Sequence, residues 1–121
     1  MTVIKLKRVY GDYEKSDGFR ILVDRLWPRG IKKETLHYDL WAKDIAPSAN
    51  LRKWFHENPD NNWEQFVFLY QRELSESEII NDFLKTIKNH DVITLLYASK
   101  SEEHNHALIL KDFLKKNLSN Q

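Results

Sequence analysis

A short stretch near the start of the chain combines the residue types that acid–base chemistry and anion binding require. Val23-Asp24-Arg25-Leu26-Trp27-Pro28-Arg29-Gly30 carries an apolar run directly into a carboxylate, two arginines and a tryptophan. Pro28 has a fixed φ and Gly30 permits the backbone to turn, so Arg29 is expected at a tight bend. A guanidinium held there can bind a carboxylate or phosphate through two parallel hydrogen bonds. The stretch therefore predicts where a site lies.

A second polar cluster follows an apolar run late in the chain. It contains Ser99 and Lys100 and, a few residues on, His104, Asn105 and His106. Imidazole titrates near neutral pH, which makes His106 a candidate general acid or base. His104 and His106 are two residues apart and do not share a helix face, so the spacing predicts no metal site.

The hydrophobic pattern predicts the elements that position the two clusters. Strands are expected over residues 2–9, 19–26 and 92–98. The last two contain almost continuous apolar runs, which is typical of strands covered on both faces. Helices are expected over residues 48–57, about 63–74 and about 103–118. Ser48 is the expected N-cap of the first helix, and Ser75 with Glu78 forms a capping box that opens a further helix. Residues 33–44 carry apolar side chains at a mixed, helix-compatible spacing.

This order of elements predicts a protein of the α/β class. We expect a small, mainly parallel sheet of about three or four strands flanked by helices in a three-layer, Rossmann-like arrangement. No linker, repeat or low-complexity segment interrupts the pattern. Residues 1–121 are therefore expected to form a single domain.

The two clusters are expected to meet in one cleft. Ligands of open parallel sheets bind outside the carboxyl ends of the strands, and both clusters follow such ends. The amino-terminal end of the last helix would add positive potential to the arginines, so the cleft is expected to attract a small anion. The candidate catalytic residues are Asp24, Arg25 and His106. The candidate binding residues are Trp27, Arg29, Ser99 and Asn105.

Three interpretations of this cluster remain open. The first is an enzyme for a phosphorylated or nucleotide-like substrate, in which Arg25 and Arg29 hold the anion while Asp24 and His106 manage protons. The second is a non-catalytic binding or regulatory module that recognises a nucleic-acid backbone or an acidic protein partner. The third is a structural network that locks the strand ends together. Solvent exposure separates them, because a locked network is buried and satisfied whereas a site leaves donors pointing into a cleft.

The composition excludes several classes of protein. The 121 residues contain no cysteine, which rules out disulfides and thiolate chemistry, and 19 Lys and Arg nearly balance 18 Asp and Glu, so no overall field favours nucleic acid. The three glycines form neither a dinucleotide-binding turn nor a P-loop, and no cofactor is expected. No apolar run approaches the ~20 residues of a membrane span. We expect a soluble, cytoplasmic protein without a membrane partner.

One motif carries a family resemblance. It is Asp24-Arg25-Leu26-Trp27-Pro28-Arg29-Gly30, supported downstream by Asp39-Leu40-Trp41, Ala46-Pro47-Ser48, Leu51-Arg52, Thr94-Leu95-Leu96-Tyr97 and Asn105-His106-Ala107. With these motifs the chain resembles the YeaO-like proteins, small bacterial members of a family of unknown function. The resemblance covers nearly the whole chain, and it implies a compact α/β domain without an established activity.

Longer relatives in the wider family resemble this chain but differ at the two clusters. They carry Asp-Val-Arg at the strand end and Cys-His-Arg at the helix start, where this chain has Asp24-Arg25 and Asn105-His106-Ala107. The cysteine and the second arginine are therefore missing. The resemblance singles out Asp24, Arg25 and His106 and argues against thiol chemistry.

Overall fold

Four parallel strands form the sheet of this protein, whose computed structural model describes residues 1–119. The strands are β1 (Val3–Arg8), β2 (Phe19–Leu22), β3 (Leu40–Trp41) and β4 (Val92–Tyr97), in the order β1-β4-β2-β3. The predicted α/β class and parallel sheet are confirmed. β4 and β2 lie at the centre of the sheet, as their nearly continuous apolar runs indicated.

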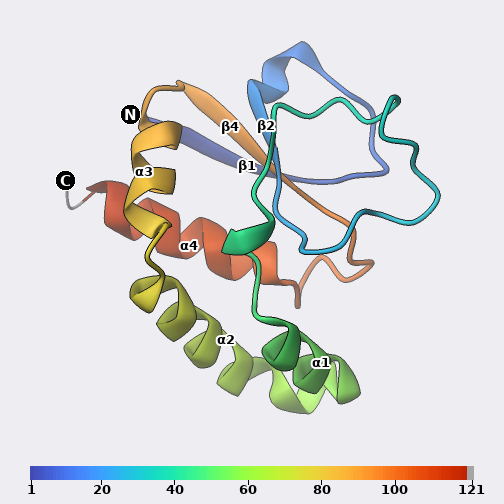
Figure 1. The fold of residues 1–121 in the computed structure, drawn as a ribbon, viewed down its shortest axis with the longest axis vertical. Coiled ribbons are helices and arrows are strands. Elements are labelled where there is room, and N and C mark those ends of the chain that lie inside the picture. Colours follow the sequence, from blue (N-terminus) through green and yellow to red (C-terminus); the bar gives the residue numbers. More distant parts are fainter. Residues whose placement is uncertain (120–121) are drawn as a thin grey trace.

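All four helices lie on one side of the sheet (Figure 1). They are α1 (Ala49–Glu57), α2 (Pro59–Glu76), α3 (Ile80–Lys88) and α4 (His106–Ser119). Each contributes buried side chains to the main core, which also contains alternate strand residues such as Ile4, Ile21 and Leu95. α4 packs directly on β1 and β4, α2 packs on α4, and α1 packs on α2, so that helices and strands share one continuous core. Among the described residues, no helix is long and apolar enough to cross a membrane.

Loops cover the opposite face of the sheet and form its third layer. They pack over a smaller apolar cluster whose buried members are Val9, Leu22 and Leu96. The segment after β2 supplies most of the cover, including Trp27 and Tyr38. This face therefore depends on side chains from irregular segments rather than on a helix.

Gly18 brings the start of β2 against β4. Its φ is 66°, and a Cβ at this position would lie 2.3 Å from the carbonyl oxygen of Val92. Both the dihedral angle and the close backbone approach require glycine. A larger residue at this position would therefore force the start of β2 away from β4.

Two predicted segments near the site need correction. The strand predicted over residues 19–26 ends at Leu22, although the Val23 amide still donates to Leu96 O at 3.0 Å before the chain turns. The helix-compatible interpretation of residues 33–44 is wrong, because the segment contains the two-residue strand β3 and leads into a short 3-10 helix at Lys43–Ile45. A strand of two residues is too short to produce a recognisable alternation.

Of the two predicted helix caps, the one at Ser48 is confirmed and the one at Ser75 is wrong. Ser48 caps α1 as expected, since its hydroxyl accepts from the Leu51 amide at 3.3 Å. The capping box at Ser75 is wrong, because α2 continues through Glu76 and the Ser75 hydroxyl donates to a carbonyl of its own helix. The last helix starts at His106, a few residues later than predicted.

Candidate functional site

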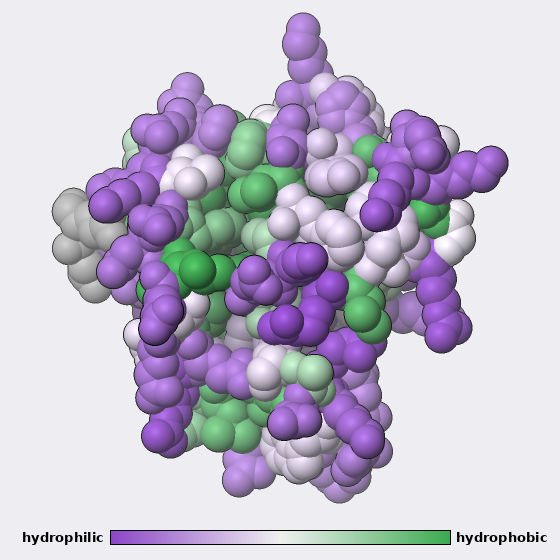
Figure 2. Space-filling view, in the orientation of Figure 1, coloured by the Kyte–Doolittle hydropathy of each residue, from purple (hydrophilic) through white to green (hydrophobic). Residues whose placement is uncertain are grey.

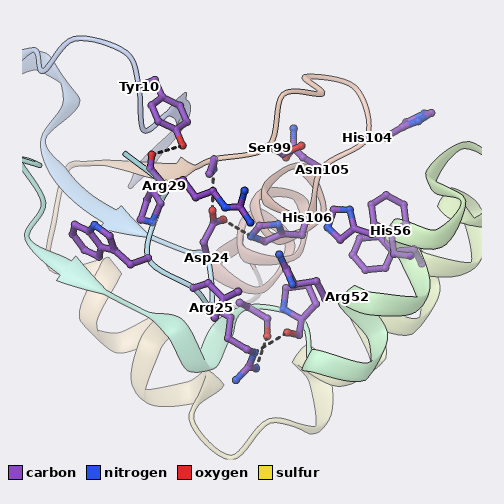
Figure 3. A pocket seen from close by; sticks show the side chains of 18 residues that line it. Tyr10, Asp24, Arg25, Arg29, Arg52, His56, Ser99, His104, Asn105 and His106 are labelled. Carbon is purple, nitrogen blue, oxygen red and sulfur yellow. Dashed lines mark hydrogen bonds and ion pairs between the residues drawn. The ribbon is translucent and has the colours of Figure 1, made fainter. Parts of the chain in front are cut away.

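A cleft of about 340 Å³ opens beyond the carboxyl ends of β2 and β4 (Figure 3). The β2 side, the β4–α4 segment and α1 form its walls, and the aromatic rings of Phe55 and Phe66 contribute an apolar surface. Seven predicted site residues line it: Asp24, Arg25, Trp27, Arg29, Ser99, Asn105 and His106. The expectation that the two sequence clusters meet in one cleft is therefore confirmed.

Asp24 ties the two central strands together at their ends. Its Oδ2 accepts a hydrogen bond from the Ala98 amide at 2.9 Å, and its backbone oxygen accepts from Trp41 Nε1 at 2.8 Å. The side chain retains 16% exposure. Asp24 is thus a structural tether that still borders the cleft.

His106, the first residue of α4, completes this tether. Its Nε2 lies 2.9 Å from Val23 O and 3.2 Å from Asp24 Oδ1. Both neighbours are acceptors, so Nε2 carries a proton and donates, whatever the charge of the ring. Asp24 Oδ1 is buried and has no hydrogen-bond partner of good geometry among the described residues. The imidazole N–H, at 3.2 Å, is the donor that faces this oxygen.

Arg25 points away from the centre of the cleft and anchors the segment before α1. Its Nε donates to Pro47 O at 3.1 Å and its Nη2 to Ala46 O at 3.3 Å (Figure 3). Two of its nitrogens are thus occupied by backbone carbonyls. The role of Arg25 in holding an anion stays a prediction, and the contacts assign it a positioning role.

Arg29 occupies the bend that the sequence predicted. Gly30 adopts a φ of 76°, and the Arg29 carbonyl accepts from the Tyr10 hydroxyl at 3.1 Å. The Arg29 side chain is exposed and extends from the loop toward the middle of the cleft (Figure 3). It takes part in none of the ion pairs formed by residues 1–119.

Trp27 lines the cleft, but most of its ring packs against other side chains. Its Nε1 donates to Ile31 O at 2.6 Å, and its ring meets Tyr38 and Trp41 edge-on at 5.5 Å and 5.4 Å. The Lys33 ammonium lies 5.7 Å from the ring centroid. These contacts make Trp27 a support of the loop layer, and its contact with a ligand stays a prediction.

Ser99 and Asn105 shape the turn that leads into α4. The Ser99 hydroxyl accepts from the Ser101 amide at 3.2 Å. Asn105 is 2% exposed; its amide donates to Ser101 O at 2.8 Å, and its Oδ1 accepts from Leu108 N at 3.0 Å. The amide therefore caps α4, in the way asparagine satisfies free N–H groups at helix starts. Contact of either residue with a ligand stays a prediction.

Two basic residues of the cleft wall were missed by the sequence analysis. Arg52 and His56 lie on α1 and line the wall opposite Arg29 (Figure 3). They are four residues apart and therefore share one helix face, which is the signal that could have identified them as a pair.

The cleft is strongly cationic although the whole chain is nearly neutral. Asp24 is the only carboxylate among its described lining residues, and it faces arginines and histidines from three segments. Partial burial, together with the positive charges of Arg52 and His106, lowers the pKa of His56. A group of strongly hydrophilic side chains is visible between the sheet and α1 in Figure 2. The geometry thus concentrates positive charge at the strand ends.

The residues of the cleft do not form a metal-binding arrangement. Within residues 1–119, no three His, Asp or Glu side chains come together as ligands. His104 turns toward α2, where its Nδ1 lies 3.4 Å from Asp60 and its ring stacks on Trp63 at 4.7 Å. It does not pair with His106.

The fold and the cleft define a small α/β protein with a parallel sheet and a polar site at its central strand ends. Residues 3–121 match a family model described as the inactive DUF488-N3 subclade. The uncharacterized protein YeaO of Escherichia coli K12 is 48% identical over 112 residues, which cover 93% of this chain and 96% of that protein. The chain therefore belongs to the YeaO-like family.

More distant relatives are similar over almost the same length. Uncharacterized proteins of Mycobacterium bovis and Mycobacterium tuberculosis are each 37% identical over 113 residues, which cover 93% of this chain and 94% of each relative. No solved structure matches the chain significantly.

Proposed function

We propose that this protein binds a small phosphate- or sulfate-like anion in the cleft without converting it. The observation that carries the proposal is the presence of two guanidinium groups, Arg29 and Arg52, that face the cleft from two sides and join no ion pair among residues 1–119. Unpaired cations in a concave site are the arrangement an anion needs. His56 lies beside Arg52 and can add a third positive charge when an anion favours its protonated form.

The contacts of the acid–base pair support binding rather than turnover. Asp24 holds the Ala98 amide, and His106 Nε2 donates toward Val23 O and Asp24. Proton transfer through these atoms would disturb the connection between β2, β4 and α4. The family model matched by the chain is described as inactive, which agrees with this interpretation.

The dimensions of the cleft favour a small ligand. Its volume of about 340 Å³ lies near the lower end of the range for small-molecule sites, which is roughly 300–1,000 Å³. The guanidinium groups would hold the anionic part, and the faces of Phe55 and Phe66 offer an apolar surface to the remainder. A phosphorylated small molecule has both features.

Titration with sodium sulfate at constant ionic strength tests the proposal. Arg29→Gln and Arg52→Gln are each expected to weaken sulfate binding by about tenfold, because each removes a charged donor. Lys53→Gln is the matched control, since Lys53 is an exposed neighbour on α1 that does not line the cleft. Equal affinity in the wild type and both arginine variants would refute the proposal.

The same samples test the enzyme and the nucleic-acid interpretations. The enzyme interpretation predicts that the protein hydrolyses a phosphate ester such as p-nitrophenyl phosphate. It also predicts that the His106→Asn variant loses this activity. The nucleic-acid interpretation predicts that a short single-stranded oligonucleotide binds more tightly than sulfate and displaces it. We expect neither turnover nor tighter oligonucleotide binding, and either result would contradict the proposed function.

A further inference from the structure

Arg20 is a buried cation whose donors are not satisfied. It lies on β2, on the sheet face that the loops cover, and its residue exposure is 1%. Nε and Nη1 are buried and have no hydrogen-bond partner among the described residues. Asp17 Oδ2 lies 3.4 Å from Arg20 Nη1. The two groups form an ion pair, but the distance is too long for a hydrogen bond of good geometry.

The nearby carboxylate is already occupied by other donors. Asp17 accepts from Lys7 Nζ at 2.9 Å and 3.1 Å and from the Glu14 amide at 3.1 Å. Two cations, Lys7 and Arg20, thus share one buried carboxylate, because the second acidic partner of Lys7, Glu14, is 64% exposed. Glu14 balances the charge of Lys7, but it does not reach Arg20, whose Nε and Nη1 stay without a hydrogen-bond acceptor among the described residues. Burial without full pairing is unfavourable for a charged group, so an additional acceptor would stabilise it.

A cavity lies beside this arginine. It has a volume of about 260 Å³ and is separate from the cleft at the strand ends, although Tyr10 borders both. Tyr13 and His37 stack at 3.7 Å on its wall, and Arg20 Cζ lies 5.2 Å from the centroid of the Tyr13 ring. Apolar side chains, among them Val9, Ile31 and Leu36, form much of the remaining wall.

We propose that this cavity is a binding site for a small monocarboxylate with an apolar or aromatic body. The carboxylate would accept from the unpartnered Arg20 donors and would place one negative charge beside Asp17, whereas a phosphate dianion would place two there. The body would occupy the space between the stacked rings and the aliphatic wall. This site does not depend on the proposed function of the cleft.

Benzoate is the probe, and the Arg20 Nε–H resonance in ¹H–¹⁵N spectra is the readout. We expect a saturable shift of this one arginine side-chain signal, which is assigned by its absence from the spectrum of Arg20→Lys. Lysine keeps the charge but lacks the Nε–H group, and the dispersion of the backbone signals shows whether the variant folds. Sulfate is expected to shift the Arg29 and Arg52 signals and to leave the Arg20 signal in place.

A second variant keeps the test independent of Arg20. Tyr13 is 48% exposed, so Tyr13→Ala removes a wall of the cavity without opening the core. Benzoate binding is expected to weaken about fivefold or more, in line with the loss of a stacking partner. Phe68→Ala is the control, because it removes an exposed ring on α2 that does not line the cavity.

Three outcomes would overturn the inference. They are an Arg20 signal that does not respond to benzoate, a benzoate response confined to Arg29 and Arg52, and equal benzoate affinity in Tyr13→Ala and the wild type. None of these bears on sulfate binding in the cleft, so the two proposals fail separately.

Discussion

Asp24 and His106 combine the properties of a site with those of a structural lock. The pair is only partly exposed, at 16% and 17% of the two side chains, and each residue bonds a backbone group of a neighbouring element. Arg29 has the opposite character, because its guanidinium is exposed and makes no ion pair in residues 1–119. The proposed anion binding would therefore depend on the free cations, whereas the tethered pair keeps the strand ends in place.

Arg29→Lys separates charge from geometry. Lysine keeps the positive charge but cannot donate two parallel hydrogen bonds from a planar fork. Sulfate affinity measured by calorimetry is expected to fall about threefold for lysine and about tenfold for Arg29→Ala. Unchanged affinity together with a lowered melting temperature would instead assign Arg29 a structural role.

His56 gives the cleft a predicted pH dependence. In the protein without a ligand, the pKa of His56 lies below its ordinary value of 6.5. A bound anion would raise this pKa again, because it favours the protonated imidazole. The bound state therefore takes up protons, so sulfate affinity is expected to increase as the pH falls below 6.5. Sulfate is the suitable probe because its own charge is constant in this range.

His56→Gln is the control for this pH dependence. The variant should bind sulfate with a flatter profile between neutral and mildly acidic pH. A profile identical to that of the wild type would mean that another group, such as His106, controls the linkage.

Two residues of α2 hold the segment that leads into α1. Tyr70, which is fully buried, donates from its hydroxyl to Ile45 O at 2.7 Å. Glu73 accepts from the Ser48 amide at 2.9 Å and from its hydroxyl at 2.5 Å. Burial raises the pKa of Tyr70 well above its ordinary value, so the hydroxyl remains a donor at physiological pH. The orientation of α1, and with it the cationic wall of the cleft, depends on these contacts.

Ser48→Ala tests this dependence. The variant removes the α1 cap and one partner of Glu73, and its free energy of unfolding is expected to fall by about 1–2 kcal/mol. Sulfate affinity should also decrease, because Arg52 and His56 are carried by the same helix. Ser119→Ala, near the end of α4, is the comparison and should leave both quantities almost unchanged. A variant that lost stability but kept full affinity would show that the cap does not position the site.

The central strands and the site region were predictable from sequence because they carry local signals. The apolar runs of β2 and β4 indicated buried neighbours, and parallel pairing then required that Asp24 and His106 approach each other. β3 was not predictable, since its two residues pair with β2 through tertiary contacts alone. Arg52 was not predicted, because it borders the cleft only through the way in which α1 packs against the rest of the fold. The network around Arg20 was also missed, because its members come from β1, β2 and the short 3-10 helix Lys15–Asp17.

At the scale of the whole molecule, Asp17 connects the loop layer to the sheet. Its side chain binds Lys7 on β1 and pairs with Arg20 on β2, and its backbone oxygen accepts from Thr94 on β4 at 2.7 Å. Burial would raise the pKa of Asp17, but the hydrogen bonds from Lys7 and the Glu14 amide and the charge of Arg20 bring it below its ordinary value of 3.8.

Acid is therefore expected to weaken the fold through Asp17. Its folded pKa lies below the unfolded one, so the stabilisation is present above pH 3.8 and is lost as the pH falls through the folded value. Asp17→Asn should reduce the free energy of unfolding by about 3 kcal/mol at pH 7, because Arg20 loses its partner. Urea unfolding at several pH values checks the sign: the difference between the two proteins should shrink below pH 3.8. A constant difference would contradict it.

The loop layer gives the two faces of the sheet different local stabilities. The helical face is closed by four packed helices, whereas residues 23–39 cover the other face with few backbone hydrogen bonds of their own. Amide hydrogen exchange is expected to be fast in this segment and slow in β4. Because the segment also carries Arg29 and borders both cavities, an occupant of either one would slow exchange there. Local opening of this layer, rather than unfolding of the whole sheet, would then set how readily ligands enter and leave.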